Sequence, residues 1–237
     1  MLIKESTIKG ISFKDIFTET PMRVLHLDAS ISGSYPGSGT VWYDLSGNGS
    51  NAQLVNGPTF SSNNSGYISF DGTNDYTNFI APNLGTTTTV EMWLKPTGTW
   101  TGKMLMGWLS YDVYTTGGTL SYNTANSDAY GISAATVNSL GITTNWAYYV
   151  FEMRSDVSYT NNKIYINGAL QTLSQLAGTQ SAANRNFNSG LGRFPGWRAN
   201  LNYLMQMDCA VFSVWNRALT QAEITANFES IRGRFGI

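Results

Sequence analysis

The sequence predicts an all-β fold in which two antiparallel sheets form a two-layer sandwich and one short helix lies near the C-terminus. Three observations indicate this architecture. Short apolar or alternating segments recur along the chain, and stretches rich in Gly, Asn and Ser separate them. Helical periodicity is convincing only over residues 220–231. A chain of 237 residues is an ordinary length for one large β domain.

The strand candidates are short, and several end at turn-forming residues. They are residues 24–28, 52–55, 67–71, 76–80, 88–95, 103–109, 147–154, 163–166 and 169–173. Within 88–95, Val90, Met92 and Leu94 alternate with Glu91, Trp93 and Lys95, which predicts a strand with two different faces. The dipeptide Asn167-Gly168 lies between two of the candidates and predicts a two-residue type I′ hairpin.

The C-terminal helix has a complete start signal. Thr220 is the expected N-cap, and Glu223 follows three residues later, which forms a capping box. Ile224, Phe228 and Ile231 then repeat on one helical face. We expect Gly233 to end the helix in a left-handed conformation.

The strand before the helix is predicted to be buried. Residues 208–215 are apolar, β-branched and aromatic. We expect Trp215 to be a core aromatic beside the helix. Cys209 is the only cysteine, so no internal disulfide can form, and we expect it to be a small buried side chain.

Composition excludes several classes of function. Charged residues are 12% of the chain, against roughly 25% in ordinary soluble domains. A net charge of −1 gives no electrostatic basis for binding nucleic acid. No run reaches the roughly 18 apolar residues of a membrane span, so no membrane insertion is expected. The first residues lack the apolar core of a signal peptide, which predicts synthesis in a cytoplasm without export.

Five segments together resemble one family. In order they are residues 25–28 with the turn 42–51, then 70–76, 90–96, 163–168 and 215–220. This series resembles the laminin-G-like branch of the concanavalin A-like jelly rolls, and the likeness covers residues 24–232. It implies a jelly-roll sandwich and predicts two parts, an N-terminal arm (1–22) and a laminin-G-like domain (23–237).

A narrower likeness rests on residues 30–60 and on the ending 232–237. Both are similar to laminin-G-like proteins of tailed-bacteriophage virions. The resemblance implies a non-enzymatic structural component of the virion (capsid decoration, neck or tail fibre), assembled in the host cytoplasm. Its partners would be other virion proteins or copies of itself. The alternative is a carbohydrate-binding receptor-recognition module, as in a tail-fibre lectin, whose partner is a host-surface glycan.

The arm carries isolated apolar residues between charges and has too little apolar surface to fold alone. We expect it to attach the domain to another virion subunit or to a second copy of the chain, with Ile3, Ile8, Ile11 and Phe13 as the contacts. The alternative is that residues 1–22 lie on their own domain as a first strand or helix.

No catalytic constellation is visible, and no cofactor is expected. Hydrolases of this superfamily resemble one another in a Glu-x-Asp-x-Glu-type strand motif, in which acids are spaced two residues apart. The chain has six glutamates, and none has a second acid at that spacing. The single histidine, His26, lies in an alternating strand without a nucleophile elbow. We therefore predict a protein that is not an enzyme.

Two kinds of binding site stay open on sequence grounds. Related jelly rolls hold calcium through loop carboxylates, and Asp28, Asp44, Asp71 or Asp75 could serve; the alternative is that these side chains cap their own turns. The loop that begins at Asp44 is not an EF-hand, because its twelfth position is Val55. A sugar platform would need an exposed aromatic beside polar groups. The candidates at loop or strand ends are Trp100, Trp108, Trp146 and Trp197, and the favoured alternative for each is a place in the core or at its rim.

Overall fold

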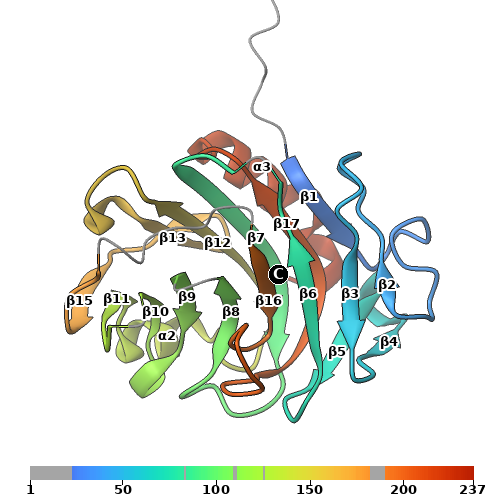
Figure 1. Ribbon diagram of the computed structural model, residues 1–237, viewed down its shortest axis with the longest axis horizontal. Coiled ribbons are helices and arrows are strands. Elements are labelled where there is room, and N and C mark those ends of the chain that lie inside the picture. Colours follow the sequence, from blue (N-terminus) through green and yellow to red (C-terminus); the bar gives the residue numbers. More distant parts are fainter. Residues whose placement is uncertain (1–22, 83, 109–110, 125, 182–189) are drawn as a thin grey trace, which may run out of the picture.

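Two antiparallel sheets face each other and enclose the core (Figure 1). The computed structural model describes residues 23–82, 84–108, 111–124, 126–181 and 190–237. The expected arm contacts Ile3, Ile8, Ile11 and Phe13 lie outside these residues, so arm attachment stays a prediction. Within the described ranges, no helix has the length and apolar character needed to cross a membrane.

The first sheet has eight strands in the order β14-β13-β12-β7-β17-β5-β4, with β1 also paired to β17. Its strands are β1 (Arg23–Asp28), β4 (Thr59–Ser61), β5 (Tyr67–Asp71), β7 (Thr87–Pro96), β12 (Ala147–Arg154), β13 (Lys163–Ile166), β14 (Ala169–Leu170) and β17 (Gln206–Trp215). The β13–β14 connection is the expected two-residue hairpin, because Asn167 and Gly168 both have positive φ, at 50° and 80°.

The second sheet has nine strands in the order β15-β11-β10-β9-β8-β16-β6-β3-β2. Its strands are β2 (Val41–Trp42), β3 (Ala52–Val55), β6 (Tyr76–Ile80), β8 (Met104–Trp108), β9 (Tyr111–Tyr114), β10 (Leu120–Asn123), β11 (Ala129–Ile132), β15 (Ser174–Ala177) and β16 (Leu191–Phe194). The all-β sandwich predicted from the sequence is therefore confirmed.

Helices are few. They are α2 (Ala134–Leu140) and α3 (Gln221–Ile231), with 3₁₀ turns η1 (Asn63–Ser65), η2 (Thr116–Gly118), η3 (Tyr159–Asn161) and η5 (Arg232–Phe235). The expectation of one helix missed α2, which is seven residues long and buries only Val137. A helix with one buried side chain has no apolar stripe for a periodicity search to detect.

An aromatic seam joins the two sheets. Phe212 of β17 in the first sheet packs on Phe194 of β16 and Phe79 of β6 in the second, with ring centroids 4.2 and 4.8 Å apart. Phe79 also meets Trp108 edge-on at 5.3 Å. Contacts between aromatic rings add to the gain from burying their area, so this seam stabilises the face-to-face packing of the sheets.

The outer face of the first sheet is covered by α3 and η5. As predicted, Val90, Met92 and Leu94 of β7 face the inter-sheet core, whereas Trp93 belongs to a second apolar cluster on the other face. Trp93 stacks on Phe235 of η5 with centroids 4.5 Å apart, and on Phe228 of α3 at 5.8 Å. The chain end therefore closes one face of the sandwich.

A buried carboxylate lies under α3. Glu91 is 4% exposed and accepts hydrogen bonds from the Tyr148 hydroxyl, from Trp215 Nε1 at 2.5 Å and from Asn227 Nδ2 at 2.8 Å. These donors satisfy its oxygens, which is what a buried charge requires. Trp215 is half-buried and packs against the second apolar cluster, with the guanidinium groups of Arg23 and Arg217 over its ring. It therefore lies beside the helix as expected, but at the margin of the core.

The helix begins as predicted and ends differently. Thr220 and Glu223 form the capping box, with each side chain accepting a hydrogen bond from the other's backbone. Gly233 does not end the helix. The chain continues through η5, which seats Phe235 on Trp93, and the left-handed residue is Gly236 at φ 72°. Burial of the Phe235 ring accounts for the extra turn.

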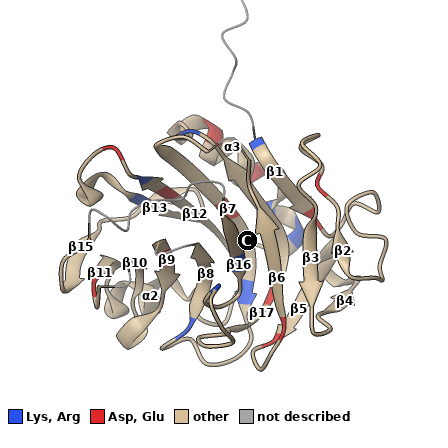
Figure 2. Ribbon diagram, viewed as in Figure 1, with Lys and Arg blue, Asp and Glu red and all other residues tan. Residues whose placement is uncertain are grey.

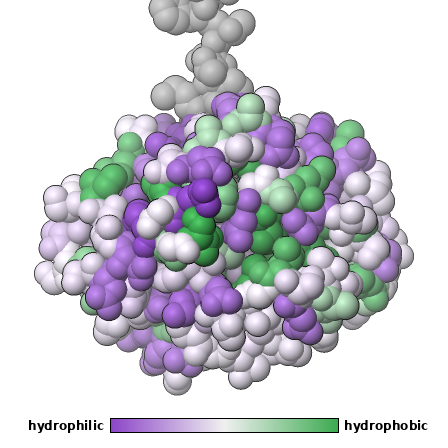
Figure 3. All heavy atoms as spheres, turned by 180° about the vertical axis from the view of Figure 1, so that it is seen from behind, coloured by the Kyte–Doolittle hydropathy of each residue, from purple (hydrophilic) through white to green (hydrophobic). Residues whose placement is uncertain are grey.

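Charged side chains are sparse and of mixed sign over the domain (Figure 2). On the face seen from behind in Figure 3, hydrophilic and weakly polar side chains predominate. Hydrophobic side chains gather there in separate patches, some of them near the middle. This mixed surface agrees with the low charge content of the sequence.

We predict that Trp93→Ala lowers the free energy of unfolding by about 3–5 kcal/mol, because it empties the contact between β7 and the chain end. Urea denaturation followed by fluorescence measures the change. Tyr43→Ala, at a site that is 43% exposed, is the control and should shift the midpoint little. Equal effects of the two substitutions would contradict the role of Trp93.

Candidate functional site

Two of the four carboxylates considered as calcium candidates are used by their own chain. Asp44 accepts hydrogen bonds from the backbone N–H groups of Ser46, Ser50 and His26 at 2.8, 3.1 and 2.9 Å. Asp28 forms an ion pair with Arg234 at 3.1 Å. Asp44 therefore caps its own turn, as the alternative to calcium binding predicted, and Asp28 holds the chain end in place.

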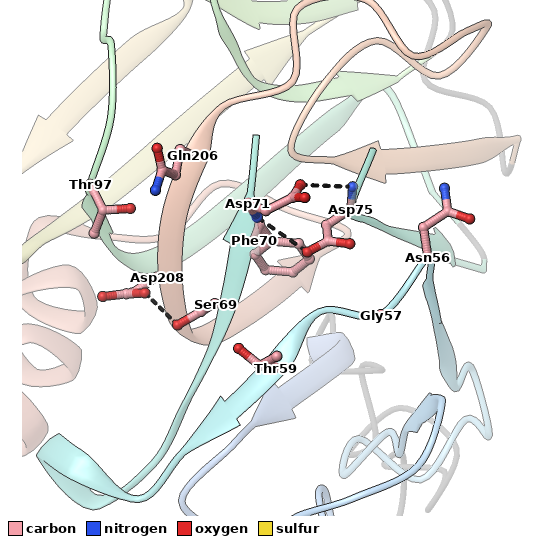
Figure 4. A pocket seen from close by; sticks show the side chains of 10 residues that line it. All are labelled: Asn56, Gly57, Thr59, Ser69, Phe70, Asp71, Asp75, Thr97, Gln206 and Asp208. Atoms are coloured by element: carbon pink, nitrogen blue, oxygen red, sulfur yellow. Dashed lines mark hydrogen bonds between the residues drawn. The ribbon is translucent and has the colours of Figure 1, made fainter. Parts of the chain in front are cut away.

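The other two calcium candidates, Asp71 and Asp75, line a polar pocket of about 520 Å³ at one end of the first sheet (Figure 4). The pocket is lined by Asn56, Gly57, Thr59, Ser69, Phe70, Asp71, Asp75, Thr97, Gln206 and Asp208. Asp71 and Asp75 bond each other's backbone N–H across the β5–β6 turn, and Ser69 donates to Asp208 at 2.6 Å (Figure 4).

The carboxylates of the polar pocket differ in their electrostatics. Burial would raise the pKa of Asp71, but hydrogen bonds from the backbone of Thr73, Asn74 and Asp75 bring this pKa below its ordinary value. Burial raises the pKa of Asp75 and of Asp208. Across the described residues, no three His, Cys, Asp or Glu side chains come together as a metal site. The structure thus brings two calcium candidates, Asp71 and Asp75, close together, and their carboxylates cap the β5–β6 turn.

The remaining residues tested for chemistry are engaged in packing. His26 is half-buried, its Nδ1 lies 2.9 Å from Ser213 Oγ, and burial lowers its pKa to about 4. Glu152 is buried and pairs with Lys163 at 3.2 Å. Cys209 is fully buried, which raises the pKa of its thiol. The contacts of these three side chains are contacts within the fold.

The four tryptophans proposed as sugar platforms fall into three environments. Trp100 and Trp108 are buried and donate to the carbonyls of Gly118 and Gly190, each at 3.1 Å. Trp146 packs on Phe235, with centroids 4.6 Å apart. Trp197 lines a pocket.

The pocket that contains Trp197 is lined by seven residues and has a volume of about 300 Å³. We call it the aromatic pocket; its residues are Met104, Asp112, Tyr114, Asn123, Ser127, Trp197 and Tyr203. Tyr203 is 41% exposed and meets Tyr114 edge-on at 5.4 Å and Trp197 at 6.4 Å. Three aromatic side chains therefore surround one hollow.

Strand alternation places the aromatic pocket on the outer face of the second sheet. Tyr111 and Val113 of β9 belong to the inter-sheet core, so Asp112 and Tyr114 point to the opposite face. Asn123 of β10 is the direct cross-strand partner of Asp112. Two polar side chains of adjacent strands therefore lie next to each other beneath the aromatic rings.

The loop that carries Trp197 is fixed to the sheet by two features. The Arg193 guanidinium donates to the carbonyls of Trp197 at 3.0 Å and Asn200 at 2.6 Å, while it lies 3.8 Å from the centroid of the Tyr76 ring. Gly107 of β8 lies directly under the loop, where an added Cβ would come within 2.7 Å of the Gly196 carbonyl oxygen. The position therefore needs glycine, and the loop is held closely.

Asp112 forms the buried polar part of the aromatic pocket. It is 1% exposed, and its Oδ1 accepts a hydrogen bond from the Trp108 backbone N–H at 3.2 Å. Its Oδ2 has no hydrogen-bond partner among the described residues. Burial raises the pKa of Asp112 to about 7, and the negative charge of Asp128 adds to this effect while Arg198 opposes it.

The sequence prediction missed Asp112, Tyr114 and Tyr203. The alternating run of residues 111–114 was a usable strand signal, because Tyr111 and Val113 are apolar and Asp112 is not. β16 was also missed, since its four residues include Gly192 and Arg193, which break an apolar pattern.

The raised pKa of Asp112 predicts how stability depends on pH. Between its ordinary pKa of 3.8 and about 7, the folded state binds more protons at this carboxyl than the unfolded state does. Stability from this group is therefore lost as pH rises through about 7. Between pH 5 and pH 8 this carboxyl should lower the free energy of unfolding of the wild type by about 3 kcal/mol, and Asp112→Asn should abolish that decrease. Urea denaturation at each pH measures the change. Parallel pH profiles of the two proteins would contradict the assignment.

Known structures resemble this fold at low sequence identity. The botulinum neurotoxin serotype D/C VPI 5993 binding domain is 12% identical, with a TM-score of 0.62 over 89% of this chain and 52% of that one. The binding domain of Paraclostridial Mosquitocidal Protein 1 is 17% identical, with a TM-score of 0.60 over 88% of this chain and 52% of that one.

A third similar structure is the binding domain of botulinum neurotoxin DC in complex with rat synaptotagmin II. It is 14% identical, with a TM-score of 0.61 over 89% of this chain and 52% of that one. The chain thus spans about half the length of each of these structures, and the likeness shows a shared fold. No curated protein matches the sequence.

Sequence comparison identifies the family. The profile of a family described as the concanavalin A-like lectin/glucanases superfamily matches residues 71–225, which include β6 to β17 and the start of α3. This match agrees with the two antiparallel sheets and with the resemblance seen in the sequence. The chain belongs to the concanavalin A-like lectin/glucanases superfamily.

Proposed function

We propose that this domain is a non-catalytic carbohydrate-binding module and that the aromatic pocket is its ligand site. The observation that carries the proposal is the combination of three aromatic side chains with a buried carboxyl that has one open oxygen. A volume of about 300 Å³ lies at the lower end of the range of ligand pockets, roughly 300–1,000 Å³.

The chemistry of a sugar fits this arrangement. A pyranose ring presents apolar C–H faces and a rim of hydroxyl groups. Tyr and Trp side chains offer a large apolar face with a polar edge, which suits both features. Tyr203 and Trp197 would pack on a ring face, and Asp112 Oδ2 would accept a hydrogen bond from a hydroxyl.

The similar structures support binding rather than catalysis. All three are described as binding domains, and one is a complex with a protein. On the chain itself, Glu91 and Glu152 are buried and bonded to neighbouring side chains, so neither is placed as a free acid or base. Both observations favour a module that recognises a partner without chemical change.

We further propose that the module is displayed on a tailed-bacteriophage virion, assembled in the host cytoplasm and attached through residues 1–22. The support is the sequence likeness of residues 30–60 and of the ending 232–237. In the fold this ending packs on the turn after β4, where Asn64 Nδ2 donates to the Arg234 carbonyl at 2.7 Å. A virion component that binds a host-surface glycan unites the two functions expected from the sequence.

Glycan binding is tested by removing the aromatic platform. We predict that Trp197→Ala and Tyr203→Ala each weaken binding at least tenfold, about 1.4 kcal/mol, because a sugar ring loses its packing surface. A glycan array identifies the ligand, and calorimetry gives the affinity. Tyr43→Ala, which removes an exposed tyrosine elsewhere, is the matched control. A wild-type protein that binds no glycan, or a Tyr203→Ala variant that binds normally, would overturn the proposal.

Attachment is tested by deleting residues 1–20. We predict that the truncated protein folds with nearly normal melting and is no longer incorporated into phage particles. Scanning calorimetry and protein analysis of purified particles give the two readouts. An unfolded product would place the arm in the core. A folded product that is still incorporated would move attachment to the jelly roll.

A further inference from the structure

The open carboxyl oxygen in the aromatic pocket determines which sugars it accepts. Resting on the proposed glycan-binding function, we infer that the aromatic pocket selects neutral pyranose sugars and rejects carboxylated ones, with Asp112 as the specificity-determining residue. The inference depends on where Asp112 lies, on the charges around it and on the hydrogen bond that fixes its side chain.

Asp112 lines the aromatic pocket, and only one of its two carboxyl oxygens is hydrogen-bonded to the described residues. Its neighbours in the sheet are Gly107 on β8 and Asn123 on β10, each directly opposite it in the strand register. Oδ1 is engaged by the Trp108 N–H, which leaves Oδ2 for the pocket. Asn123 donates to the Asp128 carbonyl at 2.7 Å, which orients its amide beside Asp112. A hydroxyl group can donate to Oδ2 without any rearrangement.

The charges around the pocket disfavour an acidic ligand. Of the seven described residues that line it, none is basic and Asp112 is acidic. Arg193 lies beside the loop, but its guanidinium is committed to the Trp197 and Asn200 carbonyls and to the Tyr76 ring. A sugar carboxylate would meet the buried Asp112 carboxylate, and no basic residue lines the pocket. The nearby charge of Arg198 lowers the pKa of Asp112 but does not outweigh the effect of burial.

The other charged and titratable groups near Asp112 come from three elements. Asp128 precedes β11, and its carboxylate accepts hydrogen bonds from the backbone of Thr124 and Asn126. Arg198 follows Trp197 in the loop, and Tyr114 and Tyr203 carry the nearby hydroxyls. Asp128 and Arg198 have opposite effects on the pKa of Asp112, so burial sets its value near 7. Asp112 is then ionised at pH 8 and protonated at pH 5.5.

The test compares neutral and acidic glycans on the intact chain. Wild type, Asp112→Asn and Asp208→Asn are measured at pH 8 with neutral hexosides and with glucuronic acid and N-acetylneuraminic acid glycosides. Asp208→Asn is the control, because it removes a carboxylate from the polar pocket and leaves the aromatic pocket unchanged. Asn at position 112 keeps an oxygen for the Trp108 N–H but removes the charge.

We expect wild type and Asp208→Asn to bind a neutral hexoside at least 100-fold more tightly than any acidic one. Asp112→Asn should bind neutral ligands at least tenfold more weakly than wild type does. Its affinities for neutral and acidic glycans should differ by less than tenfold. The unaltered protein gives a second readout that needs no folded variant. At pH 5.5, where Asp112 is protonated, its discrimination against acidic glycans should shrink by at least tenfold.

The outcomes separate this inference from the proposed function. A wild-type protein that binds acidic glycans as tightly as neutral ones overturns the selectivity and leaves glycan binding intact. Discrimination that is the same in Asp112→Asn and at both pH values assigns the selectivity to other residues and overturns the role of Asp112. A wild-type protein that binds no glycan overturns the proposed function itself.

Discussion

The packing of the C-terminal segment on Trp93 determines which face of the sandwich is available. A two-sheet sandwich has two outer faces, and an apolar face must be covered. Phe235 and Phe228 cover Trp93, and α3 lies over Glu91. The outer face of the first sheet is thereby closed over this area, and the outer face of the second sheet carries the aromatic pocket.

The aromatic pocket on the second sheet depends on a close approach between β8 and the loop of residues 196–198. Gly107 lets the backbone of residues 196–198 lie directly on β8, and Arg193 holds the same loop by its carbonyl oxygens. Trp197 and Tyr203 therefore lie on a fixed support rather than on a free loop tip. Tyr203 itself adopts a left-handed backbone at φ 62°, a conformation that a bulky residue keeps only when its surroundings enforce it. Rigid aromatic side chains lose little entropy when a ligand packs on them.

The features that the sequence predicted are local ones. The alternation in β7, the Asn167-Gly168 hairpin and the Thr220 capping box each depend on residues within one element or turn, so a short window contains the whole signal. The aromatic pocket joins residues of β8, β9 and β10 to a loop 74 to 99 positions later in the chain. Its geometry follows from sheet order, and a single sequence does not encode that order in any local pattern. Trp197 could be named as a candidate, but its partners could not.

The two buried acids of the outer faces illustrate how structural and functional carboxylates differ. Glu91 has donors from Tyr148, Trp215 and Asn227, and each comes from a different element of the fold. A carboxylate whose two oxygens both accept hydrogen bonds from the fold helps to fix a helix on a sheet. Asp112 has one donor and one open oxygen in a pocket lined by Tyr114, Trp197 and Tyr203. An oxygen left open in this way stays available to a hydroxyl donor, whereas both Glu91 oxygens already accept hydrogen bonds from the fold.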